Sequence, residues 1–448
     1  MKHYIAIDWG ATSGRVIVAH LENGHTETEE VHRFAHTIHY TEDGHCCWDF
    51  TSLLAETVTG LRKAADLGHD YESVGVDTWG VDVVFYDGEG RMLAQPLSYR
   101  DPFTASVSRL FFEQYIPAEL LYHKTGIQFL PFNTVFKLFA CRCENYRPFI
   151  EAKHILFLPD AVTCFLTGRM VCEYTALSTS AMLNPRTREF DPDILNACGL
   201  NRCLFPEIVL PGHTVGFLKP EIIETTGLNK DCRVVAVAGH DTGSAVAACP
   251  REIEGKRAAY LSCGTWSLMG VVTDEPVITE QSFRLNFTNE GGVNGTTRLL
   301  KNITGMWILE QCRKEWTEQG REYSYAQLMH MAQSVDGKAE YLFNPDEPRF
   351  ANPVSMIREV QGNFAMSDAE IVWTIYNSLA RRYGEVFRMM QSLAPWPIEL
   401  LYVIGGGARN KYLMDLTQKA VGVPVIIGPS EATAMGNISV QDQMRNDK

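Results

Sequence analysis

Long apolar runs and clusters of positive charge are both missing from this sequence. No stretch approaches the ~18 apolar residues that indicate a membrane-spanning helix, and Asp8 interrupts the first apolar segment before it reaches the length of a signal-peptide core. Lys and Arg number 40 against 54 Asp and Glu, which gives a formal net charge of −14. Surfaces that bind nucleic acid or anionic lipid need positive charge. The sequence therefore predicts a cytoplasmic protein with no nucleic-acid partner and no membrane partner.

Cysteine pairs of the metal-binding kind are missing as well. The 12 cysteines occur singly, as Cys46-Cys47 or as Cys141-Arg142-Cys143, without a CxxC pair. That pattern gives no support to a zinc ribbon, and a chain of 448 residues is too long for a small disulfide scaffold. We expect reduced cysteines, many of them packed as small apolar residues.

The two common nucleotide-binding signatures are also absent. Neither the P-loop pattern GxxxxGK[ST] nor the dinucleotide pattern GxGxxG occurs. A nucleotide therefore needs another geometry, and the turn that follows the apolar strand 4–7 offers one. It reads Asp-Trp-Gly-Ala-Thr-Ser-Gly-Arg from residue 8 to residue 15.

This turn has the groups that phosphates and a metal ion require. Its glycines allow backbone N–H groups to face an anion, and Thr12, Ser13 and Arg15 add hydroxyl and guanidinium donors. Asp8, at the end of the strand, is placed to hold hydrated Mg²⁺ beside the phosphates. The alternative is an ordinary hairpin turn.

A similar strand–turn–strand segment lies about half a chain further on, where Gly264-Thr265 separates 258–262 from 268–272. Two such copies indicate a duplicated domain. We expect domains at 1–247 and 248–448, closely packed around a cleft, with one turn from each gripping the phosphates. Residues 73–86 have the same alternation of apolar runs around a turn and also predict a hairpin.

Helical periodicity occupies the stretches between these strands. Apolar residues repeat at three and four over 53–65, 306–316 and 371–390. Gly68 is a plausible stop for the first helix, and Ser367-Asp368-Ala369-Glu370 has the form of a capping box for the last. We expect these stripes to form core.

The segment 234–246 contains the strongest catalytic candidate. An apolar strand ends at Gly239, and small residues typical of a helix start follow Thr242. Asp241 then lies at the carboxyl end of a strand, where ligands collect in α/β sheets. A carboxylate there can accept the proton of an attacking hydroxyl; the alternative is a helix N-cap.

A glycine triplet, 405–407, stands between the apolar strand 400–404 and a helical run. Glycine lets a flat ring or a phosphate approach the backbone closely. The triplet is weak evidence alone and gains meaning with the other turns. His32, His36 and His39 lack clear helical spacing, so we assign them surface or packing roles.

Taken together and in order, these segments resemble the FGGY family of carbohydrate kinases, which have the actin-like ATPase fold. The matching segments are 8–15, 76–82, 126–134, 239–242, 262–270, 288–292, 300–303, 405–407 and 436–438. Asp-Thr-Trp-Gly-Val-Asp at 77–82 and Gly-Ile-Gln-Phe-Leu-Pro-Phe-Asn-Thr at 126–134 are specific within the family. The resemblance spans nearly the whole chain and implies an α/β protein of two actin-like (ribonuclease H-like) domains with an interdomain cleft.

The resemblance also implies a reaction and its residues. ATP would phosphorylate L-rhamnulose at its C1 hydroxyl, with Mg²⁺ as cofactor, in an enzyme that is a monomer or a small homo-oligomer. Asp241 would be the general base. The remaining implied contacts are Gly80, His240 and Thr242 with the sugar, and Ala11, Thr12, Ser13, Gly14, Arg15, Thr265, Asn302, Gly406 and Asn410 with ATP. The alternatives are a kinase of the same fold for another ketose, such as L-fuculose or L-xylulose, and a silent sugar sensor. Asp241 argues against the sensor, which needs no base.

Two departures from the family pattern stand out. Glu310 occupies a position on the helix after Asn302 where the family pattern leads us to expect glutamine, which puts that nucleotide contact in doubt. Family members also run further than Lys448, into a closing helical segment. We therefore expect residues 441–448 to be polar and unanchored.

Overall fold

The computed structural model describes residues 1–10, 12–104, 106–335, 341–351 and 353–443. The chain forms two compact units. The N-terminal unit comprises 1–248, 273–299 and 433–448, and the C-terminal unit comprises 249–272 and 300–432. The division at residue 248 expected from the sequence stays a prediction; in the structure, 273–299 and 433–448 group with the N-terminal residues.

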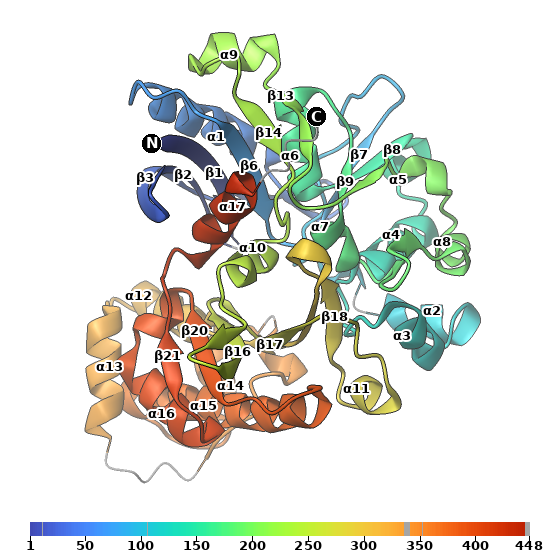
Figure 1. Cartoon of the computed structure of the whole chain (residues 1–448). Helices are drawn as coiled ribbons and strands as arrows, with labels where there is room; N and C mark the ends of the chain where they lie inside the picture. The colour runs from blue at the N-terminus through green and yellow to red at the C-terminus, as the bar shows by residue number, and fades with distance from the viewer. Residues whose placement is uncertain (11, 105, 336–340, 352, 444–448) are drawn as a thin grey trace. The chain divides into compact units, whose positions relative to one another are not determined.

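Figure 1 shows the elements along the chain. Up to residue 248 they are β1 (Lys2–Trp9), β2 (Ser13–Glu22), β3 (His25–Ala35), β4 (Ile38–Tyr40), β5 (Cys46–Trp48), α1 (Phe50–Ala65), β6 (Ser73–Thr78), β7 (Val83–Tyr86), α2 (Val107–Gln114), α3 (Ala118–Thr125), α4 (Thr134–Cys143), α5 (Arg147–Glu151), β8 (His154–Phe157), α6 (Leu158–Thr167), β9 (Cys172–Glu173), α7 (Tyr174–Ser178), β10 (Leu183–Asn184), β11 (Glu189–Phe190), α8 (Pro192–Cys198), β12 (Ile208–Val209), β13 (Thr214–Phe217), α9 (Pro220–Thr226), β14 (Arg233–Val235) and α10 (Asp241–Ala247). Beyond it they are β15 (Glu252–Ile253), β16 (Lys256–Cys263), β17 (Trp266–Thr273), α11 (Glu280–Arg284), β18 (Thr288–Gly291), β19 (Thr297–Thr304), α12 (Trp307–Glu318), α13 (Tyr325–Ser334), α14 (Met356–Gln361), α15 (Asp368–Leu393), β20 (Leu400–Ile404), α16 (Lys411–Val421), β21 (Val425–Ile427) and α17 (Ala432–Asp442).

The two main sheets have the same topology. One contains the order β3-β2-β1-β6-β14 and the other the order β19-β17-β16-β20-β21. In each, the first hairpin is antiparallel and its first strand pairs in parallel with a later strand. This repeated topology agrees with the duplication inferred from the two similar hairpins.

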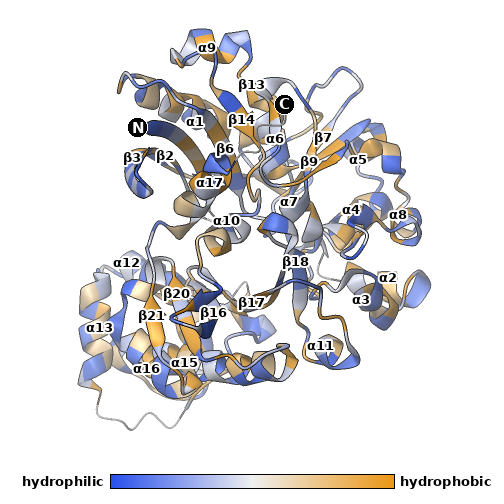
Figure 2. Ribbon diagram, in the orientation of Figure 1, coloured by the Kyte–Doolittle hydropathy of each residue, from blue (hydrophilic) through white to orange (hydrophobic). Residues whose placement is uncertain are grey.

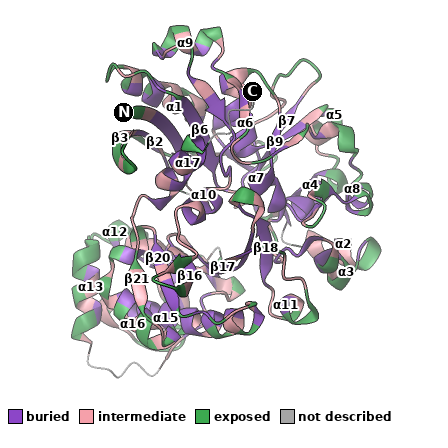
Figure 3. Ribbon diagram, viewed as in Figure 1, coloured by how far each residue is buried: buried purple, intermediate pink, exposed green. Residues whose placement is uncertain are grey.

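The strands are buried because apolar side chains point from both of their faces into packed cores. In Figures 2 and 3 the central strands are largely hydrophobic and buried, while α9 and α13 show exposed faces. One face of the N-terminal sheet packs Ile5, Ile7 and Val16 into the core that includes Leu53 and Leu61 of α1. The other face packs against α17. There, Tyr4, Ala6, Ile17 and Ala19 form a small core with Ala434 and Ile438.

The helices expected from periodicity are confirmed. They are α1, α12 and α15, and Ser367 with Glu370 forms the capping box at the start of α15. Several cysteines, Cys141 and Cys198 among them, are fully buried in an apolar core, as expected.

The hairpin expected at 73–86 is wrong. β6 pairs in parallel with β1 and β14, whereas β7 pairs with β8. Between β6 and β7 the chain changes direction at Val81, whose φ is +68°. That conformation is rare for a β-branched residue, which is why the local pattern did not reveal it.

The expectation that 441–448 is unanchored is also wrong for its first residues. Gln441 is fully buried, accepts a hydrogen bond from Ser73 (2.6 Å) and donates to the carbonyl of Ile5 (2.9 Å). Asp442 accepts hydrogen bonds from Lys2 and Tyr4, each at 2.6 Å. Residues 444–448 lie outside the described residues.

Among the described residues, no helix combines the length and the apolar character needed to cross a bilayer.

Candidate active site

Two carboxylates lie side by side at the carboxyl ends of the central strands of the N-terminal unit. Asp8 on β1 and Asp77 on β6 are register partners in the parallel pair, and both are buried. Arg15 pairs with Oδ2 of Asp8. Burial raises the pKa of Asp77 well above its ordinary value and the charge of Asp8 adds to this, while the hydrogen bond from Asn437 opposes it. Sequence reasoning selected Asp8 and gave no role to Asp77.

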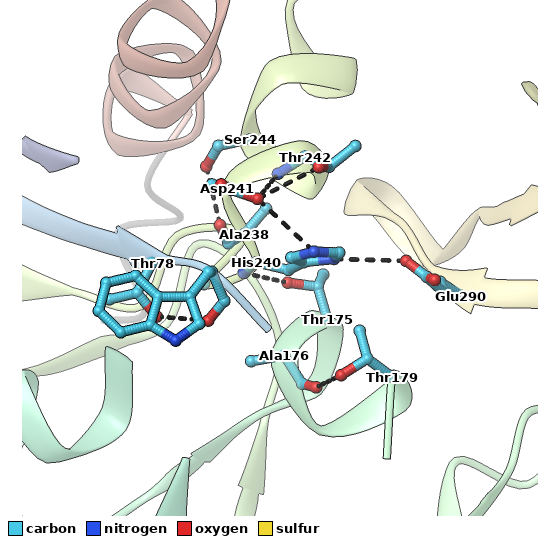
Figure 4. A network of polar contacts seen from close by, with 12 residues as sticks. Thr78, Thr175, Ala176, Thr179, Ala238, His240, Asp241, Thr242, Ser244 and Glu290 are labelled. Carbon is cyan, nitrogen blue, oxygen red and sulfur yellow. Dashed lines mark hydrogen bonds and ion pairs between the residues drawn. The ribbon is translucent and has the colours of Figure 1, made fainter. Parts of the chain in front are cut away.

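Asp241 begins α10, beyond the carboxyl end of the neighbouring strand β14. Its N-cap is His240, so the alternative that Asp241 is itself the cap is wrong. Oδ1 of Asp241 accepts hydrogen bonds from the backbone N–H (2.6 Å) and the hydroxyl (3.1 Å) of Thr242 (Figure 4). The strand expected to end at Gly239 ends earlier, at Val235, and the segment that leads on to Asp241 is held by Thr78, whose N–H donates to the carbonyl of Gly239 at 2.9 Å.

The surroundings of Asp241 act on the pKa of its carboxyl in both directions. Its side chain is 23% exposed. Burial raises its pKa and the charge of Asp8 adds to this, whereas His240 and the Thr242 hydrogen bonds lower it. A base whose pKa rises toward the working pH accepts a proton more effectively in the transition state.

Three polar groups surround the ring of His240, and Figure 4 shows two of them, Asp241 and Glu290. Nδ1 lies 3.3 Å from Oε2 of Glu290 and 3.3 Å from Arg298, while Nε2 lies 3.5 Å from Oδ1 of Asp241. Burial alone would raise the pKa of Glu290, but Arg298 and His240 hold it below its ordinary value. Arg298 is itself 1% exposed and donates to the carbonyl of Gly291 at 2.9 Å.

Sequence reasoning missed Glu290 and Arg298. They lie on β18 and β19, some fifty residues after His240, where local pattern gives no sign that they meet its ring. The only signal was that residues 288–292 belong to the family resemblance. Leaving either charge of a buried Glu–Arg pair unpaired costs much free energy, so the two side chains stay in place. The imidazole that contacts them is thereby held as well.

Gly80 lies against the same imidazole. A Cβ at this position would stand 3.3 Å from Cδ2 and Nε2 of His240 and 3.4 Å from Oγ1 of Thr179. The next residue, Val81, has the positive φ noted above. Strain of this kind persists only where surrounding structure enforces it, and it concentrates at ligand sites. Gly80, His240 and Thr242, for which the resemblance implied sugar contacts, thus lie close together in the structure, and their role stays a prediction.

The turn expected to face the phosphates joins β1 to β2 directly after Asp8. Gly10 N–H donates to the carbonyl of Ser13 at 3.1 Å, and Thr12 is exposed. Gly14 is needed because a Cβ there would lie 2.3 Å from the ring of Phe34. Arg15 points back to Asp8. Ala11 lies outside the described residues.

In the C-terminal unit, the turn with Thr265 meets two other candidate segments at one end of the sheet. The carbonyls of Gly264 and Thr265 accept hydrogen bonds from the N–H groups of Met306 (2.9 Å) and Trp307 (3.1 Å), just past Asn302 on β19. A Cβ on Gly305 would lie 2.7 Å from the carbonyl oxygen of Gly264.

The glycine triplet packs against the same end of β16. Side chains at Gly405 and Gly407 would come within 2.7 Å and 2.3 Å of Cys263, whereas Gly406 between them is exposed and has open space around it. Asn410 caps α16 by accepting a hydrogen bond from Leu413 N–H at 3.0 Å. The structure thus gathers Thr265, Gly406 and the end of β19 within this unit.

Glu310 does not offer a free side chain. One carboxylate oxygen lies 2.9 Å from Arg313, and the other accepts a hydrogen bond from Tyr325 at 2.8 Å. Arg313 and Tyr325 thus already contact both carboxylate oxygens of Glu310, the residue that departs from the family pattern.

Models of known families match both parts of the chain. The N-terminal domain of the FGGY family of carbohydrate kinases matches residues 3–248, and the C-terminal domain of that family matches residues 259–441. A rhamnulokinase of Bacteroides thetaiotaomicron is 46% identical over 448 residues, covering 98% of this chain and 90% of the relative. A rhamnulokinase of Bacillus subtilis is 39% identical over 446 residues, covering 98% and 89%.

Solved structures share the fold at low sequence identity. A gluconate kinase from Lactobacillus acidophilus superposes with a TM-score of 0.83 at 15% identity, covering 100% of this chain and 90% of that one. A xylulose kinase from the same organism gives 0.80 at 14% identity, covering 100% and 91%. These likenesses confirm the expected α/β fold of two actin-like domains.

Proposed function

The chain belongs to the FGGY family of carbohydrate kinases, and on that premise we propose that it transfers the terminal phosphoryl group of ATP to the C1 hydroxyl of L-rhamnulose. The products are L-rhamnulose 1-phosphate and ADP. The choice of sugar is supported by relatives named rhamnulokinase that are 37–46% identical over 98% of the chain. The same relatives disfavour another ketose and a silent sensor.

The observation that carries the mechanism is the placement of Asp241. Among the described residues, its recorded contacts with Thr242 and His240 all fall on Oδ1. We assign Oδ2 to the sugar. As the C1 oxygen attacks the γ-phosphorus, its proton passes to this oxygen, the bond from phosphorus to the β,γ-bridging oxygen breaks, and ADP leaves.

His240, Thr242 and Gly80 are assigned to the sugar. The Glu290–Arg298 pair keeps the His240 ring in one orientation, so that Nε2 faces the side of Asp241. Gly80 leaves room beside the ring that a side chain would occupy. Fixed donors and a fixed base hold the sugar hydroxyl in a geometry from which it can attack. This positioning supplies much of the rate enhancement in enzymatic phosphoryl transfer.

The strand-end carboxylates fit a magnesium ion. Oδ1 of Asp77 is buried and has no hydrogen-bond partner among the described residues, and Asp8 is adjacent in register. Mg²⁺ in kinases is held by one or two carboxylates together with water and phosphate oxygens. We assign it to Asp8, as the sequence predicted, and add Asp77. The ion supplies positive charge that neutralises the phosphates.

ATP is assigned to the two turns and the glycine triplet. Ala11, Thr12, Ser13, Gly14 and Arg15 contact its phosphates from the N-terminal unit. Thr265, Asn302, Gly406 and Asn410 bind it from the C-terminal unit, where the exposed Gly406 lets a flat ring approach the backbone. We place the reaction in the cytoplasm, where ATP is available, in a monomer or small homo-oligomer.

A coupled ADP-release assay across a panel of ketoses, with L-rhamnulose, L-fuculose and L-xylulose included, tests the substrate. We expect the highest kcat/KM with L-rhamnulose; a higher value with another ketose would replace it as the substrate.

Asp241→Asn tests the base. It should lower kcat by roughly 10²–10⁴ while sugar binding persists. Asp231→Asn, an exposed aspartate ten residues earlier, is the matched control. Near-normal turnover of Asp241→Asn would remove Asp241 from the mechanism.

A further inference from the structure

Three histidines far apart in sequence meet at one end of the N-terminal sheet, the end of β1 and β2 that is remote from Asp8. His3 on β1 and His20 on β2 are direct partners in the antiparallel register, and these strands lie side by side in Figure 1. His69 comes from the loop between α1 and β6. All three are partly buried.

Their rings form one cluster. Nδ1 of His3 lies 2.7 Å from Nδ1 of His20. The rings of His3 and His69 stack at 4.2 Å between centroids with an interplanar angle of 9°, and His69 meets His20 edge to face at 5.0 Å. One nitrogen of each histidine lies within 4.8 Å of a nitrogen of the other two.

The position of the cluster makes its composition informative. Along β1 and β2, His3 and His20 continue the face on which Ile5, Val16 and Val18 pack into the core beneath α1. Apolar side chains would extend that core at no electrostatic cost. Three imidazoles packed together repel one another when protonated, which is a cost that apolar side chains would not carry. Neutral imidazoles are the form that binds transition metals.

We propose that His3, His20 and His69 form a binding site for a divalent transition-metal ion of the zinc type. Three histidine nitrogens at about 2.0–2.1 Å from the ion, with water as fourth ligand, make a tetrahedral site in which the nitrogens stand roughly 3.3 Å apart. To reach that geometry the His3–His20 pair, now 2.7 Å apart, must open slightly, and the ring of His69, now stacked on His3, must turn so that its nitrogen faces the same ion. The loop that carries His69 follows α1 and contains Gly68, whose φ is +75°, and it is held at its far end, where Glu72 N–H donates to the carbonyl of His3 at 2.9 Å.

The ion has a structural role. It ties the loop that follows α1 to the first hairpin, and it binds the folded chain because the three ligands come together only there. Residues 3, 20 and 69 lie away from Asp8 and Asp77 along the same strands, so the site is separate from the proposed magnesium position. The inference does not depend on which sugar is phosphorylated.

The test uses the full-length protein without a polyhistidine tag, stripped with a chelator and dialysed. Zn²⁺ is titrated by calorimetry, and Co²⁺ is added in parallel to follow the visible absorption of a tetrahedral site. We expect one equivalent of either ion and a higher melting temperature with Zn²⁺. His69→Gln, in the loop, should lower the affinity at least 100-fold, and His20→Gln should do the same. His25→Gln is the control, because His25 is 79% exposed on the adjacent strand β3.

Two results overturn the proposal. One is the absence of stoichiometric Zn²⁺ binding by the folded wild-type protein at tens of micromolar Zn²⁺. That result would mean that the three histidines only stack and hydrogen-bond with one another. The other is Zn²⁺ binding that His69→Gln does not weaken. If His20→Gln fails to fold, circular dichroism will show it, and the loop variant then decides the question.

Discussion

The side-chain amide of Asn437 donates a hydrogen bond of 2.6 Å to Oδ2 of Asp77, joining residues 360 positions apart. Asn437 is fully buried in α17, and its side-chain oxygen Oδ1 accepts a hydrogen bond from Nε2 of Gln441 at 2.7 Å. The same helix crosses α10 at Gly436, where a Cβ would lie 1.7 Å from the carbonyl oxygen of Ser244. The last helix of the chain thus supports both the strand-end carboxylate and the helix that begins with Asp241.

Asn437→Ala removes the described donor to Oδ2 of Asp77. Because a buried acceptor left unsatisfied costs its desolvation, we expect the free energy of unfolding to fall by about 1–3 kcal/mol. Urea denaturation measures the loss. Gln443→Ala, at an exposed position just after the helix, serves as the control and should change stability little. An Asn437→Ala protein as stable as the wild type would mean that the hydrogen bond does not support the fold.

Asp82→Asn breaks a buried ion pair beside Gly80. Lys137 pairs with Asp82, and the two side chains are 2% and 0% exposed. Oδ2 of Asp82 also accepts hydrogen bonds from the indoles of Trp48 (2.7 Å) and Trp79 (2.8 Å). Leaving Lys137 charged and unpaired in the core should cost about 3–5 kcal/mol of unfolding free energy.

The double variant Asp82→Asn, Lys137→Met separates pairing from packing. It should lose less stability than the sum of the two single variants, because neither charge is then left alone. Glu113→Gln, which breaks the exposed pair with Arg109, is the matched control and should cost at most about 1 kcal/mol. Strict additivity of the Asp82 and Lys137 variants would contradict the pairing.

Gly80→Ala places a methyl group against His240. Since that carbon would stand 3.3 Å from two atoms of the ring, the imidazole must shift from its contact with Asp241. We expect KM for the sugar to rise at least roughly tenfold, as when a positioning contact is disturbed, with the melting temperature nearly unchanged. Gly88→Ala is the control, because its methyl group would meet only Lys153 at 3.7 Å. Equal KM values in the two variants would place the sugar elsewhere.

The pH profile of kcat/KM reports the state of Asp241. The carboxyl accepts a proton only when ionised, so activity should rise with pH as Asp241 deprotonates. Burial, with the charge of Asp8, raises its pKa, so this acid limb should lie above the ordinary aspartate value of about 3.9. Thr242→Val removes the hydroxyl that stabilises the charged form and should move the limb to still higher pH.

Profiles of the wild type and of Thr242→Val, measured with saturating Mg-ATP, test this direction. Thr225→Val, which removes a hydroxyl bonded to a carbonyl on the exposed helix α9, should leave the limb in place. A limb that moves to lower pH in Thr242→Val would show that another group controls it.

Local sequence was sufficient where short-range chemistry decides the structure. The apolar runs and turns around Asp8 and Thr265 identified the two hairpins, and the capping box at Ser367 marked the start of α15. The pattern around Asp241 correctly placed it after a strand and at the start of a helix. The family resemblance is confirmed by both family models, while the individual roles of the site residues stay predictions.

The tertiary structure decided what depends on register and on distant chain segments. Sequence could not show that His3 faces His20, that Glu290 and Arg298 hold His240, or that Asn437 reaches Asp77. It also gave a wrong hairpin at 73–86 and a wrong view of Gln441. Local propensity reports the preferences of neighbouring residues, whereas these contacts form only after strands pair and helices pack, when burial makes each unpaired polar group costly.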